Sequence, residues 1–208
     1  MRTPLVFVVA VVLAGCRAER APGPSPLAPP EPSRIAVLAF QVAEGAVPPP
    51  VPSDLGLGAA RALAARLASE GLDVVDPDRV FGATGLVDTG TYDPAFATRV
   101  ARRVGANLAA LGVITRLRER EGTAWAAKTP ASLAYQATLV RARDGAAVTV
   151  HRFDYTQQAL TQNLLDLPRF VKGGARWLTA AELLHGAVGE TAEHFASALG
   201  VRRAPAPR

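Results

Sequence analysis

Two glycines and one acidic residue have the spacing that comes closest to a ligand-binding motif. Gly56 and Gly58 open a helical pattern after a predicted strand, and Asp76 stands twenty positions beyond Gly56, at the end of a second predicted strand. Glycines in such a turn let a phosphate approach the backbone, and an acid at that distance can bind a ribose hydroxyl. One reading of the chain is therefore a nucleotide- or small-ligand-binding α/β enzyme domain that uses the turn from Gly56 to Arg61.

The same residues also fit an ordinary helix start rich in alanine and glycine. Fifteen residues, 41–55, separate the first strand from Gly56, whereas a phosphate-binding turn should follow its strand directly. Arg61 occupies the place of the third small residue of that motif, where a long side chain would separate the helix from the strand. We therefore favour the helix start over a dinucleotide site.

Other catalytic chemistry lacks its residues. The histidines are His151, His185 and His194. His185 and His194 lie nine positions apart on different helical turns, so we expect no metal site and no cofactor. No Gly-x-Ser-x-Gly motif is present, so a serine hydrolase lacks its usual local signal. Pro77 between Asp76 and Asp78 favours a turn over a pair of catalytic carboxylates, and we expect no enzymatic activity.

The single cysteine, Cys16, follows a short apolar run at the start of the chain. Residues 5–13 are apolar, Arg2 precedes them, and Leu13, Ala14 and Gly15 lead directly into the cysteine. A membrane-spanning helix needs about 20 apolar residues, so this run has the length of a signal-peptide core. The Leu-Ala-Gly-Cys motif resembles the bacterial lipobox. That resemblance implies that residues 1–15 are a lipoprotein signal peptide, and that Cys16 becomes the acylated (palmitate-type) N-terminus.

The residues after Cys16 predict where the folded part stands. Arg17 occupies the position where Asp often retains lipoproteins in the inner membrane, so the resemblance implies an outer-membrane anchor facing the periplasm. Six prolines in residues 17–33 predict an extended tether of about 50 Å. We expect residues 16–33 to be the acylated cysteine with its tether, residues 34–203 a single domain, and residues 204–208 a disordered tail.

Charge does not indicate nucleic acid. The net charge is +5 and falls to +4 when Arg2 is removed with the signal peptide. Arginines cluster at 99–103 and 116–120, but Glu119 interrupts the second group and no aromatic residues alternate with them for base stacking. We expect membrane attachment through acyl chains and a protein partner in the envelope.

Hydrophobic periodicity predicts a mixed α/β domain. Residues 35–40 form an apolar run typical of a central strand covered on both faces. Helices are expected from about residue 55, capped by Ser53 or Asp54, to Gly71, and from Pro94, capped by Asp93, to Gly105. The predicted strands are 35–40, 72–76, 108–117, 133–143 and 147–155, and residues 82–93 are expected to be loop. The order β-α-β-α-β-β-β-α predicts a mixed sheet of about five strands with packed helices.

The C-terminal part reads as two helices. Phe170, Trp177, Leu178 and Leu184 form one apolar stripe, and Val188, Ala192, Phe195 and Leu199 form a second. Gly186 and Gly189 stand between these stripes, and glycine is unfavourable inside helices. We expect the two glycines to separate the two helices.

Several segments resemble a known group of envelope domains. Residues 34–40, residues 71–76, the Val-Gly-Ala-Asn turn at 104–107 and the Asp144-Gly145 turn look like the strands and turns of domains related to the TolB N-terminal domain and the curli-secretion lipoprotein CsgG. More narrowly, the chain is similar to an uncharacterised group of predicted bacterial lipoproteins. The resemblance implies an α/β fold in the cell envelope and supplies no catalytic residues.

Four polar and aromatic residues are candidates for contacting a partner. Residues 156–163 are polar and uncharged and could form an exposed functional loop or a plain connector. Tyr155 and Trp177 are core candidates that could instead anchor a partner, because Tyr and Trp are enriched in interface hot spots. We therefore interpret the chain as a non-enzymatic binding or assembly module. Its candidate partner-binding residues are Tyr155, Gln157, Gln158 and Trp177.

Overall fold

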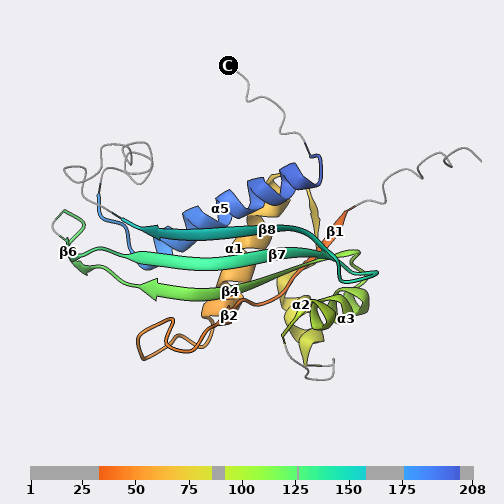
Figure 1. Cartoon of the computed structure of the whole chain (residues 1–208), viewed down its shortest axis with the longest axis horizontal. Helices are drawn as coiled ribbons and strands as arrows, with labels where there is room; N and C mark the ends of the chain where they lie inside the picture. The colour runs from red at the N-terminus through yellow and green to blue at the C-terminus, as the bar shows by residue number, and fades with distance from the viewer. Residues whose placement is uncertain (1–32, 86–91, 126, 158–175, 202–208) are drawn as a thin grey trace, which may run out of the picture. The chain divides into compact units, whose positions relative to one another are not determined.

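A mixed sheet forms the centre of the domain (Figure 1). The computed structural model describes residues 33–85, 92–125, 127–157 and 176–201. In chain order the elements are β1 Arg34–Val37, β2 Gln41–Val42, α1 Leu55–Ser69, β3 Asp73–Val74, α2 Pro77–Thr84, α3 Pro94–Val104, β4 Leu108–Arg118, β5 Glu121–Gly122, β6 Ala127–Thr129, β7 Ser132–Arg141, β8 Ala147–Thr156 and α5 Ala180–Ala198.

The strand order of the main sheet is β3-β1-β4-β7-β8, with β2 paired to β4. The β1 strand pairs in parallel with β3 and β4, while β7 runs antiparallel to both of its neighbours, β4 and β8. This arrangement confirms the predicted mixed sheet of about five strands. The turn between β7 and β8 lies at the predicted place, and Gly145 has a φ of 73° there, which glycine adopts without steric cost.

Alternating side chains of the central strands enter two different cores. Ile35 and Val37 of β1 pack with α1 and α5, whereas Ala36 and Leu38 pack with α2 and α3. Successive side chains of a strand point to opposite faces, so the apolar run at 35–40 needs helices on both sides of it. Figure 1 shows α1 and α5 behind the long strands, and α2 with α3 at the end of the sheet where β7 turns into β8.

The helix termini follow their capping residues. The Asp93 carboxylate accepts a hydrogen bond from the Phe96 N–H at 2.8 Å, with Pro94 in the first turn. Gly105 ends this helix in the left-handed region, at a φ of 74°. Both ends of α3 are as predicted. Helix α1 begins at Leu55, but the Asp54 side chain makes no capping hydrogen bond.

One helix was missed in the sequence. Residues 77–84 form α2, although a turn at Pro77 and a loop from residue 82 were expected. Asp76 accepts a hydrogen bond from the Asp78 N–H at 2.9 Å, and proline is well tolerated in a first helical turn. Val80 and Ala83 are buried against α3 and the sheet. Asp76 and Pro77 therefore start a helix. Because Val80 and Ala83 are buried, the helix continues into residues that were expected to be loop.

The expected break at Gly186 and Gly189 was wrong. A single helix, α5, runs through both glycines for 19 residues. Two interior glycines cost about 1 kcal/mol each relative to alanine, and α5 offsets this by burying one face against α1 and the sheet, from Leu183 to Phe195. Phe170 and Gln158 lie outside the described residues, as do residues 1–32 and 202–208, so the predictions for the signal peptide, most of the tether and the tail stay predictions.

Candidate functional site: a groove between β8 and α5

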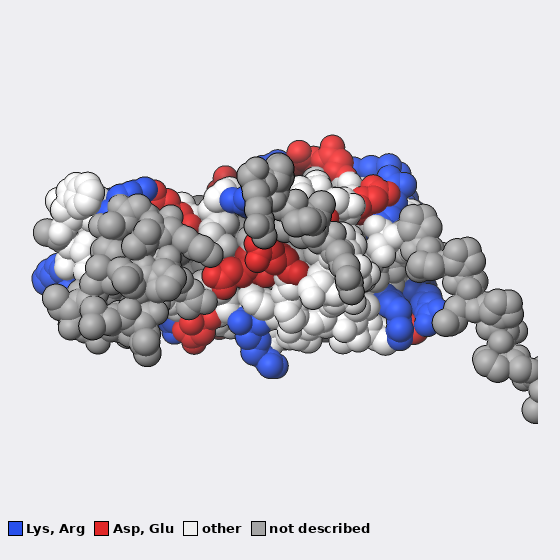
Figure 2. Space-filling model, turned by 90° about the horizontal axis from the view of Figure 1, so that it is seen from above, with Lys and Arg blue, Asp and Glu red and all other residues white. Residues whose placement is uncertain are grey.

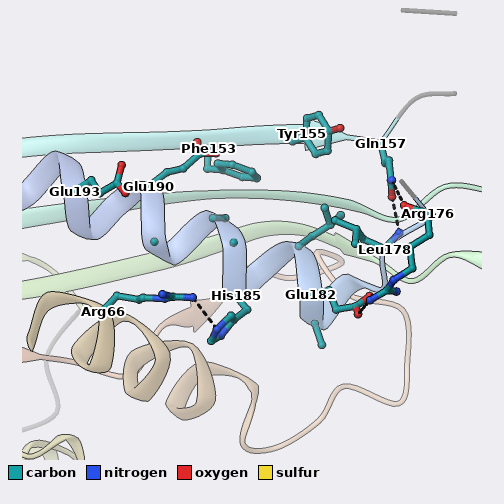
Figure 3. A pocket seen from close by; sticks show the side chains of 15 residues that line it. Arg66, Phe153, Tyr155, Gln157, Arg176, Leu178, Glu182, His185, Glu190 and Glu193 are labelled. Carbon is teal, nitrogen blue, oxygen red and sulfur yellow. Dashed lines mark hydrogen bonds and ion pairs between the residues drawn. The ribbon is translucent and has the colours of Figure 1, made fainter. Parts of the chain in front are cut away.

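A groove of about 780 Å³ runs along α5 (Figure 3). Its walls are β8, the residues leading into α5, the exposed side of α5, and Arg66 of α1. The apolar part of the lining includes Phe153, Tyr155 and Leu178. The rest of the lining includes charged groups of both signs, so the groove combines apolar area with polar groups and suits a ligand or a segment of a partner protein.

The glycines that failed to break α5 help to form this groove. Gly186 and Gly189 both line it. A Cβ built on Gly186 would meet nothing within 4 Å, and one on Gly189 would lie 3.9 Å from the Arg66 Nε. The absence of side chains at these two positions therefore leaves open space along the helix, which a larger residue would fill.

The aromatic residues of β8 are held from behind by the core. The Phe153 ring stacks on Tyr135 of β7, with centroids 5.7 Å apart and planes 19° apart, and Tyr155 lies 6.3 Å from Phe153. Phe153 is buried and Tyr155 is half-buried. Of the two predicted aromatic contact residues, Tyr155 thus lies on the groove wall.

An ion pair closes the groove at the start of α5. Arg176 donates to both carboxylate oxygens of Glu182. The Thr179 N–H also donates to Glu182, at 2.8 Å, while the Thr179 hydroxyl accepts from the Glu182 N–H, which completes a capping box. The bond from Arg176, followed by that from Thr179, lowers the pKa of Glu182 from 4.5 to about 2. At this corner of the groove the charges of Arg176 and Glu182 neutralise each other, and hydrogen bonds hold both side chains in place.

Gln157 is buried, whereas an exposed loop was one of the two interpretations of residues 156–163. Only 1% of its surface is accessible. Its amide nitrogen donates to the Arg176 carbonyl oxygen and its amide oxygen accepts from the Leu178 N–H, both at 2.7 Å. A buried amide with both ends satisfied ties the end of β8 to the start of α5. Trp177 is half-buried, and its backbone N–H donates to the Ala124 carbonyl oxygen at 2.8 Å. The partner-binding role of these residues stays a prediction.

The structure brings together His151 and His194, a pair that the sequence pattern does not indicate. The rings of His151 on β8 and His194 on α5 lie 5.1 Å apart. His151 Nδ1 lies 2.9 Å from the Thr191 hydroxyl, which also bonds to the buried Tyr135 hydroxyl at 2.6 Å, and His194 Nε2 lies 2.7 Å from the Thr149 hydroxyl. Burial, then the neighbouring His194, lowers the pKa of His151. Forty-three positions separate the pair in the sequence, so only the β8–α5 contact reveals it.

Three residues of the nucleotide hypothesis, Gly56, Arg61 and Asp76, have structural partners, whereas a Cβ on Gly58 would meet nothing within 4 Å. A Cβ on Gly56 would lie 2.0 Å from the Phe40 carbonyl oxygen, so glycine is needed there for α1 to approach the first strand region. Arg61 forms an ion pair with Asp78 at 2.5 Å, and Asp76 caps α2. These contacts account for the three residues without a nucleotide.

Within the described ranges, no three His, Cys, Asp or Glu side chains are grouped to hold a metal ion. Among the same residues, no helix combines the length and the apolar character that crossing a membrane requires.

No protein-family model matches the chain, and no curated protein matches it. Several solved structures are similar. The PelC dodecamer from Paraburkholderia phytofirmans is 15% identical, with a TM-score of 0.49 over 82% of this chain and 89% of that one. Lipoprotein GNA1162 from Neisseria meningitidis is 16% identical, with a TM-score of 0.45 over 69% and 94%. The C-terminal domain of LpoB from Escherichia coli is 16% identical, with a TM-score of 0.41 over 61% and 84%.

Every one of these TM-scores lies below 0.5, so none of these similarities assigns a function to this chain. The specific resemblance to TolB and CsgG domains stays a prediction.

Proposed function

We propose that this chain is a lipoprotein of the cell envelope whose α/β domain is a non-enzymatic module that binds another envelope protein. Acyl chains on Cys16 hold it in the membrane, with the outer membrane as the expected site and the domain facing the periplasm. The β8–α5 groove is the binding surface. The observation that carries this proposal is the groove itself, which has an aromatic wall, an open glycine floor and a rigid polar end.

The contacts of the groove favour binding over catalysis. Its most perturbed carboxylate, Glu182, is paired with Arg176 and so held ionised, and it is engaged in the cap of α5. A general acid or base needs a pKa near the working pH and a free path to its substrate, and Glu182 has neither. Tyr155, by contrast, is a half-buried aromatic side chain on the groove wall, and Tyr is enriched among the residues that contribute most of the binding free energy in protein interfaces.

Two linked experiments test the proposal. Cys16→Ser should move the protein from the membrane fraction to the soluble fraction without changing the stability of its folded domain. Stable anchoring needs two or more acyl chains, each contributing about 0.8 kcal/mol per buried CH₂. If Cys16→Ser stays in the membrane fraction, the lipoprotein assignment is wrong.

The groove is tested by photo-crosslinking in intact cells. A photoreactive phenylalanine analogue at Tyr155 should capture one discrete envelope protein. The same analogue at Phe81, which is 52% exposed on α2 at the other face of the sheet, is the matched control and should not capture that protein. Capture at Tyr155 should be lost in Gly186→Leu, which fills the groove, and kept in Gly186→Ala. Equal capture from both positions would contradict the proposed surface.

A further inference from the structure

The outer edge of β8 is the starting point for a more specific inference. β8 is the last strand of the main sheet and pairs with β7 along almost its whole length, from Ala147 to Thr156. Within the described residues, no backbone group is paired with the opposite edge of β8 between Val148 and Asp154. An edge of this kind presents N–H and C=O groups in the spacing that another strand requires.

The groove lies beside this edge. Phe153 and Tyr155 are two positions apart and both line the groove, and α5 forms its other wall (Figure 3). Side chains on one face of a strand repeat about every 7 Å, and a helix of 19 residues is about 28 Å long. A strand added next to β8 would therefore place alternate side chains against α5. Gly186 and Gly189 leave room for them.

The charged residues of β8 do not protect the edge. Natural edge strands often carry charges that repel a further strand. Here Arg152 bonds to Gln136 of β7 at 2.9 Å, and Asp154 forms an ion pair with Arg116 of β4. Both side chains therefore point toward the inner strands of the sheet, on the face away from α5. They do not cover the outer edge of β8.

Charge indicates what kind of strand would fit. Glu190 and Glu193 line the groove and rise from α5 on the side that faces β8 (Figure 3). Acidic side chains also gather near the middle of the face shown in Figure 2. Two basic residues also line the groove, and of these Arg176 pairs with Glu182 and Arg66 contacts His185 at 3.0 Å. A basic side chain on the incoming segment would find favourable charge at Glu190 and Glu193.

We propose that β8 binds an extended segment of the partner protein by strand addition. Backbone hydrogen bonds join the segment to the edge of β8, alternate apolar side chains enter the groove, and a Lys or Arg lies near Glu190 and Glu193. Main-chain pairing supplies affinity in this mode, and the side-chain pockets supply specificity. The inference rests on the proposed function, because it specifies how the same groove is used.

The test uses the full acylated chain in detergent micelles. A random twelve-residue peptide library displayed on phage is selected on this protein and counter-selected on Gly186→Leu. Enriched peptides should have apolar residues at alternate positions and carry at least one Lys or Arg.

The best peptide is then synthesised with alternate amides N-methylated, in each of the two registers. Methylation of the amides that point toward β8 should weaken binding at least tenfold, which corresponds to the free energy of roughly one lost hydrogen bond. Methylation of the amides that point away from β8 should leave binding unchanged.

A charge test uses the same peptide. Glu190→Gln combined with Glu193→Gln should weaken its binding by about threefold to tenfold, the effect of one partly exposed ion pair. Glu44→Gln, an exposed acid in the loop before α1, is the control and should leave binding unchanged. An equal loss in the control would overturn the assignment of the basic side chain to Glu190 and Glu193.

The outcomes separate this inference from the proposed function. Equal tolerance of both methylation registers would overturn strand addition while the groove remained a binding site. Failure to enrich any peptide on the native chain over Gly186→Leu would overturn both. A dimer in sedimentation experiments that Gly186→Leu abolishes would overturn the assignment to a separate partner, because the added strand would then belong to a second copy of this chain.

Discussion

The two faces of the sheet differ in the side chains that they bury and in the partners of their buried hydroxyls. The core under α2 and α3 consists of small aliphatic residues around Phe96. Its buried Thr98 donates to the Ala95 carbonyl oxygen of its own helix at 2.8 Å. Under α1 and α5, the buried polar groups of Tyr135 and Thr191 bond to each other at 2.6 Å across two elements.

What distinguishes the two faces in function is that only the α1–α5 face borders the groove. Bonds between elements occur on the α2–α3 face as well, where Tyr92 donates to the Ala39 carbonyl oxygen and Arg102 donates to the Ala142 carbonyl oxygen. Buried bonds between elements are costly when broken and fix relative orientation when satisfied. Such bonds hold α5 against β7 and β8 on the face that borders the groove, so we expect changes there to affect binding as well as stability.

The largest effect is expected from truncating a buried phenylalanine on either face. Phe195→Ala and Phe96→Ala should each lower the free energy of unfolding by about 3–5 kcal/mol in urea titrations, since their side chains are 0% and 6% exposed. Under conditions where both variants remain folded, only Phe195→Ala should reduce partner capture from Tyr155. Equal capture by both variants would contradict the functional difference between the faces.

A smaller effect is expected at the amide that joins β8 to α5. Gln157→Leu leaves the Arg176 carbonyl oxygen and the Leu178 N–H without their bonds, and should lower the free energy of unfolding by about 1–3 kcal/mol. Gln136→Leu is the control, because its partner Arg152 is exposed, and should change stability by at most about 0.5 kcal/mol. If both changes cost the same, Gln157 does not hold the groove corner.

Filling the groove slightly should help the fold. Gly186→Ala should raise the free energy of unfolding by about 0.5–1 kcal/mol, because alanine is the better helix former and the added Cβ meets nothing within 4 Å. Thermal unfolding measures this gain. If Gly186→Ala instead lowers the free energy of unfolding, the space beside α5 is not open. The α1–α5 face would then have no groove to distinguish it from the α2–α3 face.

The smallest effect is a pH dependence on the α5 face. The folded pKa of His151 lies below its ordinary 6.5, so between those two values the unfolded chain binds more protons. The free energy of unfolding should therefore fall as the pH drops through 6.5. His151→Asn should reduce this slope between pH 7 and pH 5 in urea titrations, and His194→Gln should reduce it as well, by removing one cause of the shift. Slopes equal to that of the native chain would contradict the proposed coupling.

Local patterns were sufficient for much of the fold. The apolar run at 35–40, the Asp93-Pro94 start and Gly105 end of α3, and the Asp144-Gly145 turn each act within a few residues. Such signals depend on dihedral preferences and nearby hydrogen bonds, which a sequence shows directly. The α2 helix was missed because the Asp76-Pro77 pair suits a turn and a helix start equally well, and the burial of Val80 decides between them.

By itself, the sequence determined the mixed α/β class, the order of the long strands, and the absence of a recognisable catalytic motif. Only the tertiary structure decided that α5 continues through Gly186 and Gly189, that Gln157 is buried, and that His151 meets His194. The physical reason is that these features depend on contacts between β8 and α5, which lie far apart along the chain. Packing of α5 on the sheet offsets the cost of its glycines, and the space that they leave becomes the groove.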